Sequence, residues 1–245
     1  MPRQSLSDAV FTQLKQSILR GELPAGEALP AERALCTALG VNRGALREAL
    51  KRLEQAGLVR IQHGGGTRVA DFVRTAGLEL LPDLLFGPDG QVNTAVARGV
   101  MEMRSTLAVD IARRAASRRS PDHLKALSQC VKQMALSQDD LPELQRLAME
   151  FWGQAVQATD NLAYRLAYNS LARTYTPIFD VLTQALSQEL LDLEAYEAIV
   201  EAIAGQAAER AAQLAKDLTM KGEAGLLQVL AALDALQPPE DPDES

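Results

Sequence analysis

Residues 31–55 contain the pattern that most restricts the fold of this chain. Ala31 to Leu39 are typical of a short helix, and Gly40 follows them as a common helix-ending residue. After a tight connection, Asn42 is well suited to cap a second helix, roughly Arg43 to Gln55. Two helices joined by so few residues are typical of a helix-turn-helix.

The segments on either side extend this pair to a winged helix-turn-helix. Apolar residues at helical spacing predict an earlier helix over residues 8–20. After the pair, Leu58 to Ile61 and Thr67 to Val69 are short strand candidates joined by three glycines, so they predict a hairpin. The order helix, helix, turn, helix, hairpin assigns residues 1–72 to a DNA-binding domain.

The remainder of the chain predicts helices. Residues 73–91 are a predicted linker with some helix, broken at Pro82 and Pro88. Amphipathic helical patterns then fill residues 92–236, and residues 237–245 are an acidic, proline-rich tail that we expect to be disordered. The expected breaks between these helices lie at 120–122, 139–142, 159–161, 176–177 and Gly205. The predicted fold class is therefore mainly α, a winged helix-turn-helix followed by an all-helical domain.

Two features bear on the compartment. The chain has no run of about twenty apolar residues, which a membrane-spanning helix needs, and its first residues lack the layout of a signal peptide. Cys36 and Cys130 lie far apart in apparently helical segments, so we expect reduced thiols rather than a disulfide. These features predict a cytoplasmic protein with no membrane partner.

Charge is divided unevenly along the chain. Residues 1–74 contain eleven Lys and Arg and seven Asp and Glu, whereas the remainder contains fourteen and twenty-five. The overall acidity argues against indiscriminate binding of nucleic acid. A basic first third on an acidic chain indicates instead that one N-terminal module binds an anion.

The second helix of the pair carries a cationic stripe. Arg43, Arg47 and Lys51 recur at four-residue spacing, on a different face from a stripe of leucines. Arginine can pair bidentately with guanine, and the N-terminal end of a recognition helix reaches base edges. Asn42 at that end suits a phosphate oxygen, and Arg33 on the preceding helix can add a contact. For each cation taken singly, an ordinary solvated face is the alternative.

The glycine run does not match a nucleotide-binding loop. A P-loop needs G-x-x-x-x-G-K-[ST] and a dinucleotide site needs G-x-G-x-x-G opening a helix, and neither occurs. Two histidines and no recognisable Ser-His-Asp arrangement leave no predicted catalytic residue, enzyme activity or cofactor. A glycine tip would instead let His63 and Arg68 approach a narrow DNA groove, where cations are favoured.

The stretch GELPAGEALPAERALCTALGVNRGALREALKRLEQAGLVRIQHGGGTRV resembles the DNA-binding domain of the GntR superfamily of bacterial transcription regulators, through its LPAER, LGV-x-R, LREAL and GLV elements. The all-helical second part and the length resemble the FadR subfamily. The IQHG segment and the pattern at Thr75 to Leu81 resemble its acyl-CoA-responsive members. The resemblance implies a homodimer on a palindromic operator, with the second domain binding an effector and forming the dimer. The DNA contacts it implies are Arg33, Arg43, Arg47 and, on a wing in the minor groove, His63 and Gly64.

The resemblance also bears on metal binding. Many members of the subfamily hold a metal with one Asp and three His, but this chain contains only His63 and His123. A three-histidine site is therefore excluded, and we expect no metal. On the family's motif, Ala148 takes the Asp position, Trp152 takes a His position and Tyr196 falls near another. The resemblance thus implies a metal-free cavity for an acyl-CoA or a related organic acid, whose binding would relieve repression.

Arg104 is the strongest effector-site candidate. It lies within an apolar stripe of a helix predicted over about 95–118, and a buried guanidinium must be paired because an unpaired charge is costly. Its partner is either an internal carboxylate, for instance Glu150, or an anionic group of the effector, which the resemblance favours. The expected aromatic walls of the effector site are Trp152, Tyr168, Tyr175 and Tyr196.

Other effectors stay open. Lys221, Gly222 and Glu223 match the acyl-CoA regulators only loosely, and the tryptophan expected just after them is absent. A regulator of the same fold that senses a small carboxylate or a sugar acid is the first alternative. A DNA-binding structural protein without an effector is an alternative of another class, favoured if the helical domain has no cavity.

Overall fold

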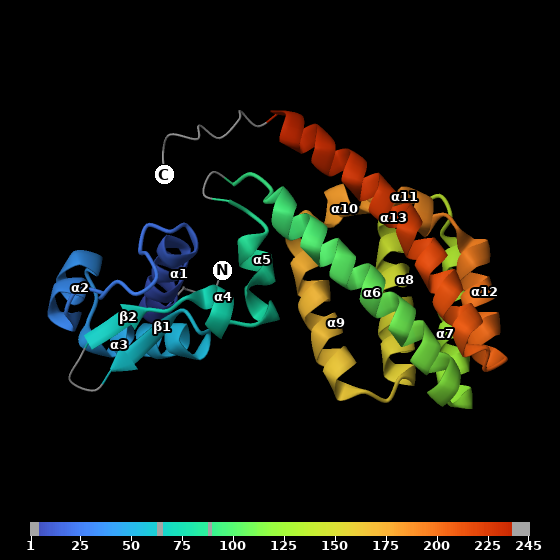
Figure 1. Ribbon diagram of the computed structural model, residues 1–245, viewed down its shortest axis with the longest axis horizontal. Helices are drawn as coiled ribbons and strands as arrows, with labels where there is room; N and C mark the ends of the chain where they lie inside the picture. The colour runs from blue at the N-terminus through green and yellow to red at the C-terminus, as the bar shows by residue number, and fades with distance from the viewer. Residues whose placement is uncertain (1–4, 63–65, 88–89, 237–245) are drawn as a thin grey trace. The chain divides into compact units, whose positions relative to one another are not determined.

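The computed structural model describes residues 5–62, 66–87 and 90–236 (Figure 1). Its contacts divide the chain into two units, Met1–Gln91 and Val92–Ser245. The first unit combines helices with a two-stranded sheet and the second is a bundle of helices, which confirms the predicted fold class. No helix within the described ranges is long and apolar enough to cross a membrane. The predicted acidic tail lies outside these ranges.

The first unit is a winged helix-turn-helix. Its strands are antiparallel and pair Val59 with Val69 and Gln62 with Gly66. The register places successive side chains of the hairpin on alternate faces. The elements, in chain order, are α1 (Leu6–Leu19), α2 (Glu32–Leu39), α3 (Arg43–Gln55), β1 (Val59–Gln62) and β2 (Gly66–Val69).

Two local signals form the turn between α2 and α3. Gly40 has a φ of 65°, in the left-handed region that glycine enters without a Cβ clash. Asn42 Oδ1 accepts a hydrogen bond from the Ala45 backbone nitrogen at 2.9 Å, which caps α3. One short turn therefore ends α2 and begins α3.

The core of the first unit packs α1 against α3. Each aliphatic side chain that is fully buried contributes roughly 1.5–3 kcal/mol, so this packing determines which face of α3 points outward. The buried residues of α3 are at most 2 % exposed. The residues that make this contact are Val10, Leu14 and Ile18 of α1 and Leu46, Ala49, Leu50 and Leu53 of α3.

Residues 72–84, which the sequence assigns mostly to a linker, continue the first unit. Leu80 belongs to its core and is 4 % exposed. Thr75 Oγ1 donates a hydrogen bond to the Gly57 carbonyl at 2.6 Å. Gly57 has a φ of 72°, and a Cβ there would lie 2.5 Å from the backbone carbonyl oxygen of Thr75. Glycine therefore permits this close approach. The elements are α4 (Phe72–Thr75), η1 (Leu78–Leu80) and α5 (Leu81–Leu84).

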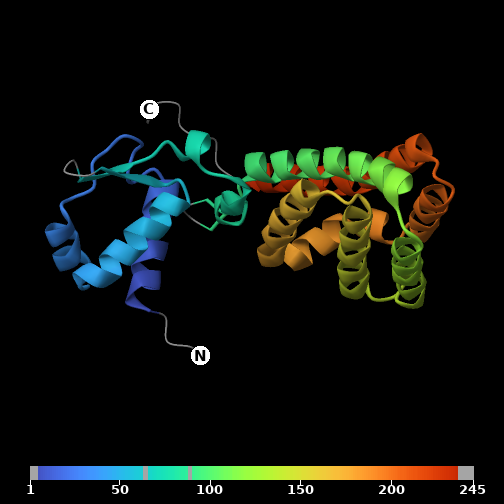
Figure 2. The same cartoon turned by 90° about the horizontal axis from the view of Figure 1, so that it is seen from below.

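The second unit is built around its two longest helices, α6 and α13, which lie side by side. Helices α7, α8 and α9 lie on one side of the layer that these two form (Figure 2). The elements are α6 (Thr94–Arg118), α7 (Pro121–Leu136), α8 (Leu141–Ala158), α9 (Leu162–Tyr175), η2 (Thr176–Ile178), α10 (Phe179–Ala185), α11 (Ser187–Leu190), α12 (Leu193–Ala204) and α13 (Ala208–Leu236).

Short polar side chains begin three of these helices. Ser120, Asp140 and Asn161 each accept a hydrogen bond from a backbone nitrogen and cap α7, α8 and α9, at the predicted breaks. The sequence does not predict the further interruptions that leave α11 as a four-residue helix. This short helix brings a side chain into the cavity described below.

Candidate DNA-binding surface and effector cavity

The exposed face of α3 carries the cations that the sequence assigns to DNA. Arg43, Arg47 and Lys51 are all exposed, whereas the leucines of α3 are buried. Asn42 is also exposed, at the N-terminal end of the helix, where free N–H groups favour an anion. Because its Oδ1 already caps the helix, its amide nitrogen is the atom left to meet a phosphate oxygen.

Arg47 already has a protein partner. Its Nε lies 2.9 Å from Glu32 Oε2 of α2, and the two side chains are 65 % and 41 % exposed. An exposed ion pair of this kind contributes only about 0–1 kcal/mol. DNA can therefore replace Glu32 at little cost. Arg33 is exposed on the same short helix.

The wing places two arginines opposite each other. Arg60 of β1 and Arg68 of β2 are cross-strand partners and both are exposed. Like charges at opposite positions destabilise a hairpin, so this pair favours an anion-binding role. Arg68 Nη1 also donates to the Gly26 carbonyl at 3.0 Å. The sequence reasoning missed Arg60, although the hairpin register would have found it. His63 and Gly64 lie outside the described residues.

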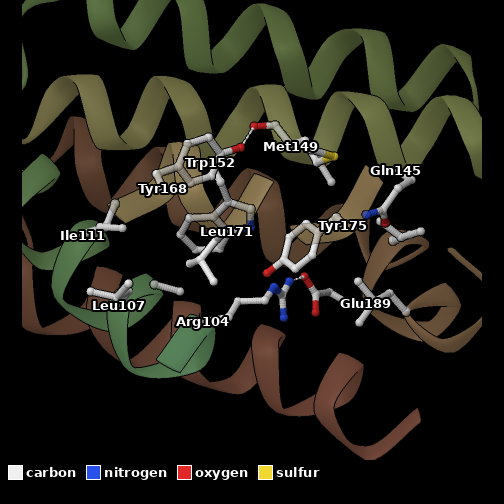
Figure 3. Close-up of a pocket in the computed structure, with 14 residues that line it drawn as sticks. Arg104, Leu107, Ile111, Gln145, Met149, Trp152, Tyr168, Leu171, Tyr175 and Glu189 are labelled. Atoms are coloured by element: carbon white, nitrogen blue, oxygen red, sulfur yellow. Dashed lines mark hydrogen bonds and ion pairs between the residues drawn. The ribbon is translucent and has the colours of Figure 1, made fainter. Parts of the chain in front are cut away.

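The second unit contains a cavity of about 50 Å³ among α6, α8, α9 and the α10–α11 segment (Figure 3). A water molecule needs roughly 10–15 Å³, so this space corresponds to about three to five waters. Four of the five predicted effector residues line it, namely Arg104, Trp152, Tyr168 and Tyr175. The other lining residues are Leu107, Ala108, Ile111, Gln145, Ala148, Met149, Leu171, Leu186, Glu189 and Leu190.

Arg104 is paired inside the protein. Its Nη2 forms an ion pair with Oε1 of Glu189 on α11, and the two side chains are 11 % and 0 % exposed. The partner suggested from the sequence, Glu150, is wrong because that side chain lies on an exposed part of α8. Burial opposes the charge of Arg104, but the adjacent Glu189 carboxylate more than compensates and raises the pKa of the guanidinium. Burial raises the pKa of the Glu189 carboxyl, and Arg104 opposes that shift.

Aromatic rings form much of the cavity wall. Tyr175 lies beside the ion pair, and Trp152 and Tyr168 lie farther along the wall (Figure 3). The Tyr168 hydroxyl donates to the Met149 carbonyl. Burial raises the pKa of Tyr175 to about 12, so this phenol stays neutral at physiological pH.

Tyr196 is not one of the lining residues. It is fully buried, and its ring packs edge-on against Phe151 with centroids 5.0 Å apart. This packing holds the ring in the core and explains why it does not form part of the wall. Burial raises the pKa of its hydroxyl well above the ordinary value.

Several buried polar atoms at the cavity have no hydrogen-bond partner in the described part of the chain. They are Arg104 Nη1, Gln145 Oε1 and Glu189 Oε2, which belong to residues that line the cavity. Trp152 Nε1 is instead directed toward the Tyr196 hydroxyl. Leaving a buried polar group unpaired costs about 1–3 kcal/mol, so a bound molecule or ordered water is expected to satisfy these atoms.

Helix α13 closes the site behind Glu189. A Cβ at Gly222 would overlap the Glu189 carboxylate, so only glycine fits there without displacing it. The flanking residues, which match the acyl-CoA regulators loosely, have partners within the unit. Lys221 Nζ lies 2.5 Å from Asp192 Oδ2, and Ser105 Oγ lies 3.3 Å from Glu223 Oε2.

The cavity does not have the donor set of a metal site. Ala148 and Trp152, which stand at two of the family's ligand positions, are lining residues that supply no metal ligand. The Nδ1 of His123 accepts a hydrogen bond from the Ser120 backbone nitrogen in the cap of α7. Among the residues that the structure describes, no three His, Cys, Asp or Glu side chains gather as metal ligands.

Comparisons with known proteins decide the family. The family model of bacterial regulatory proteins, gntR family, matches residues 6–69, and that of the FCD domain matches residues 99–219. The HTH-type transcriptional regulator Mce2R of Mycobacterium tuberculosis (strain CDC 1551 / Oshkosh) is 36% identical over 230 residues, which cover 94% of this chain and 95% of that protein. The chain belongs to the GntR family.

Further relatives support this membership. A fatty acid metabolism regulator protein of Erwinia tasmaniensis is 30% identical over 200 residues, covering 77% of this chain and 82% of that protein. A solved structure described as "Lar controls the expression of the Listeria monocytogenes agr system and mediates virulence" shares the fold, with a TM-score of 0.54 at 18% identity, covering 94% of this chain and all of that one. As a GntR regulator with an FCD domain, the chain is a transcription regulator and not an enzyme. Regulators of this family bind DNA and effector ligands.

Proposed function

We propose that this regulator is a repressor that releases its operator when an organic effector enters the cavity of the helical unit. The DNA half of the proposal rests on one observation above all. Arg43, Arg47 and Lys51 are exposed along a helix whose leucines, Leu46, Leu50 and Leu53, are held in the core. The effector half rests on the unpaired polar atoms around an otherwise largely apolar cavity.

In this proposal α3 enters the major groove. Arg43 and Arg47, in its first two turns, read base edges, while Lys51 and Asn42 contact phosphates. The wing, with Arg60 and Arg68 and the predicted His63 and Gly64, lies along the adjacent minor groove, and Arg33 adds a contact from α2. A homodimer would present two such surfaces to a palindromic operator in the cytoplasm.

The effector would bind without a metal, with its polar end beside Arg104 and its apolar body against Trp152 and Tyr175. A cavity of about 50 Å³ suits a small molecule or the end of a larger one. The acyl-CoA that the resemblance implies therefore requires the cavity walls to open. A small carboxylate or a sugar acid requires a smaller opening. A structural DNA-binding protein is less favoured, since ordered water alone would then have to satisfy the buried polar atoms.

Release of DNA requires the effector to bind the DNA-free state more tightly than the DNA-bound state. The test starts by selecting tight-binding duplexes from random DNA with the purified protein, followed by fluorescence anisotropy. We expect a palindromic site that holds two chains and is bound more weakly when acyl-CoA thioesters or small organic acids are added. Selection without any enriched sequence would refute the DNA half. Unchanged operator affinity with every compound, together with no retained ligand in native mass spectrometry, would refute the effector half.

A further inference from the structure

The charge of the cavity is already balanced by the protein. Of the described residues that line it, Arg104 and Glu189 are the charged ones at neutral pH, and they are paired with each other. The remaining lining residues are apolar or neutral polar. Arg104 is therefore not an unpaired cation that is available to an anionic ligand.

A ligand carboxylate would meet an electrostatic penalty at this site. It would have to share Arg104 with Glu189, which places two negative charges beside one positive charge. Removing an ion from water costs several kcal/mol in a protein interior, and a guanidinium that is already engaged recovers little of that cost. A neutral ligand does not incur it.

Glu189 has little room to withdraw. Its side chain is 0 % exposed, and the neighbouring Leu186 and Leu190 are at most 2 % exposed. Its carboxylate fills the space that a side chain at position 222 of α13 would need. The carboxylate is therefore a permanent part of the wall rather than a group that a ligand displaces at low cost.

The unpaired atoms add a second constraint. Arg104 Nη1 is a hydrogen-bond donor, whereas Gln145 Oε1 and Glu189 Oε2 are acceptors. A carboxylate offers acceptors alone. A primary amide or a hydroxyl offers both a donor and an acceptor, so it can satisfy atoms of both kinds.

We infer that the buried end of the effector is uncharged and carries both a donor and an acceptor, and that Glu189 sets this preference. The inference rests on the proposed function, because it takes the cavity as the effector site. In place of the carboxylate of an organic acid, the buried end of the effector would be a neutral group such as an amide or an alcohol. A larger effector can still carry charge outside the cavity.

The test uses Trp152, which is the chain's only tryptophan and lines the cavity. Butyramide and butyrate, which have the same shape and differ in charge, are titrated while Trp152 emission is followed, and calorimetry provides a second readout. The wild-type protein is expected to bind butyramide at least about 10-fold more tightly than butyrate. In Glu189→Gln, the cavity gains one positive charge and the order is expected to reverse.

The double variant Arg104→Gln, Glu189→Gln is the matched control. It makes the cavity neutral again, so it should return to preferring butyramide. It also covers the case in which Glu189→Gln fails to fold, because the double variant leaves no unpaired charge in the core. Far-ultraviolet circular dichroism checks that each variant keeps its helices.

The outcomes separate the two proposals. Tighter binding of butyrate by the wild-type protein, an undiminished amide preference in Glu189→Gln, or a lost amide preference in the double variant would overturn this inference and leave the cavity as the effector site. If neither probe changes Trp152 emission or gives heat in any of the proteins at millimolar concentrations, the cavity does not bind such ligands. The inference would then fail, whereas the effector half of the proposed function is decided by the operator-release test and by native mass spectrometry.

Discussion

At the scale of single residues, Glu189 and Gly222 depend on each other. The carboxylate on α11 occupies the space that any side chain at position 222 of α13 would need. Glycine inside a helix is less favourable than alanine by roughly 1 kcal/mol. Its presence at this position therefore reflects a spatial requirement, and the buried ion pair depends on a residue that has no functional group of its own.

Gly222→Ala is expected to destabilise the protein by roughly 1–3 kcal/mol, because the new Cβ displaces the Glu189 carboxylate from Arg104. Gly99→Ala is the matched control, since Gly99 lies in α6 with no neighbouring atom within 4 Å of the added Cβ. This control should stabilise the helix by up to about 1 kcal/mol. Urea unfolding measures both changes, and effects of the same sign would contradict the steric explanation.

Arg47→Ala is expected to lower operator affinity by about 1–3 kcal/mol, or roughly 5- to 150-fold, because a bidentate contact to a base is lost. Arg146→Ala is a close control, since both arginines are 65 % exposed and both pair with a glutamate. Fluorescence anisotropy on the selected operator should show a loss for Arg47→Ala alone. Equal affinities of the two variants would argue against a base contact.

Arg104 shows which part of the candidate effector site could be predicted. Its position in an apolar stripe of α6 predicted a buried and paired guanidinium, and the structure confirms both. The partner could not be predicted in the same way, because Glu189 lies 85 positions away in the sequence. Which carboxylate reaches Arg104 depends on the tertiary packing of α10 to α12, and so the suggested Glu150 was wrong. Tyr196 was expected in the wall for its aromatic ring, yet packing against Phe151 holds it in the core.

At the scale of elements, a helix boundary could be predicted where neighbouring residues determine it, and not where tertiary packing does. Gly40 and Asn42 act on their immediate neighbours, so the turn and the bounds of α3 could be predicted from residue types alone. The interruptions on either side of α11 contain neither proline nor glycine, and the four-residue helix packs against α8 and α13. A break that arises from tertiary packing leaves no local signal in the sequence.

Asn42→Ala is expected to destabilise the first turn of α3 by about 1 kcal/mol, because the Ala45 N–H loses its acceptor. Asn42→Ser keeps a capping oxygen and should retain most of this stability. Hydrogen exchange at the N-terminus of α3 measures the effect directly. Exchange as slow in Asn42→Ala as in the wild-type protein would show that the cap contributes nothing.

At the scale of the whole molecule, the charge distribution restricts how DNA can be approached. The chain has a net charge of −7, although its first 74 residues carry a net charge of +4. A negatively charged body repels the DNA backbone, while a local basic surface attracts it. We therefore expect weak binding to random DNA and a preferred orientation on the operator.

Operator affinity is expected to fall steeply with salt, because each phosphate contact releases counterions. Lys51→Ala should reduce the slope of log affinity against log salt by about 1 for each chain bound. Lys125→Ala, an exposed lysine of the second unit, should leave the slope unchanged. A slope for Lys51→Ala equal to that of the control would place Lys51 away from any phosphate.

The hydrogen bond from Thr75 to the Gly57 carbonyl has a consequence for protein engineering. A chimaera that joins the effector domain of another protein at residue 72 would delete Thr75 and Leu80. The Gly57 carbonyl after α3 would then lose its hydrogen bond, and the hydrophobic core would contain a cavity. A junction after Gln91 transplants these contacts together with α3 and the wing. The DNA-binding unit that can be transferred to another protein is therefore longer than the winged helix-turn-helix itself.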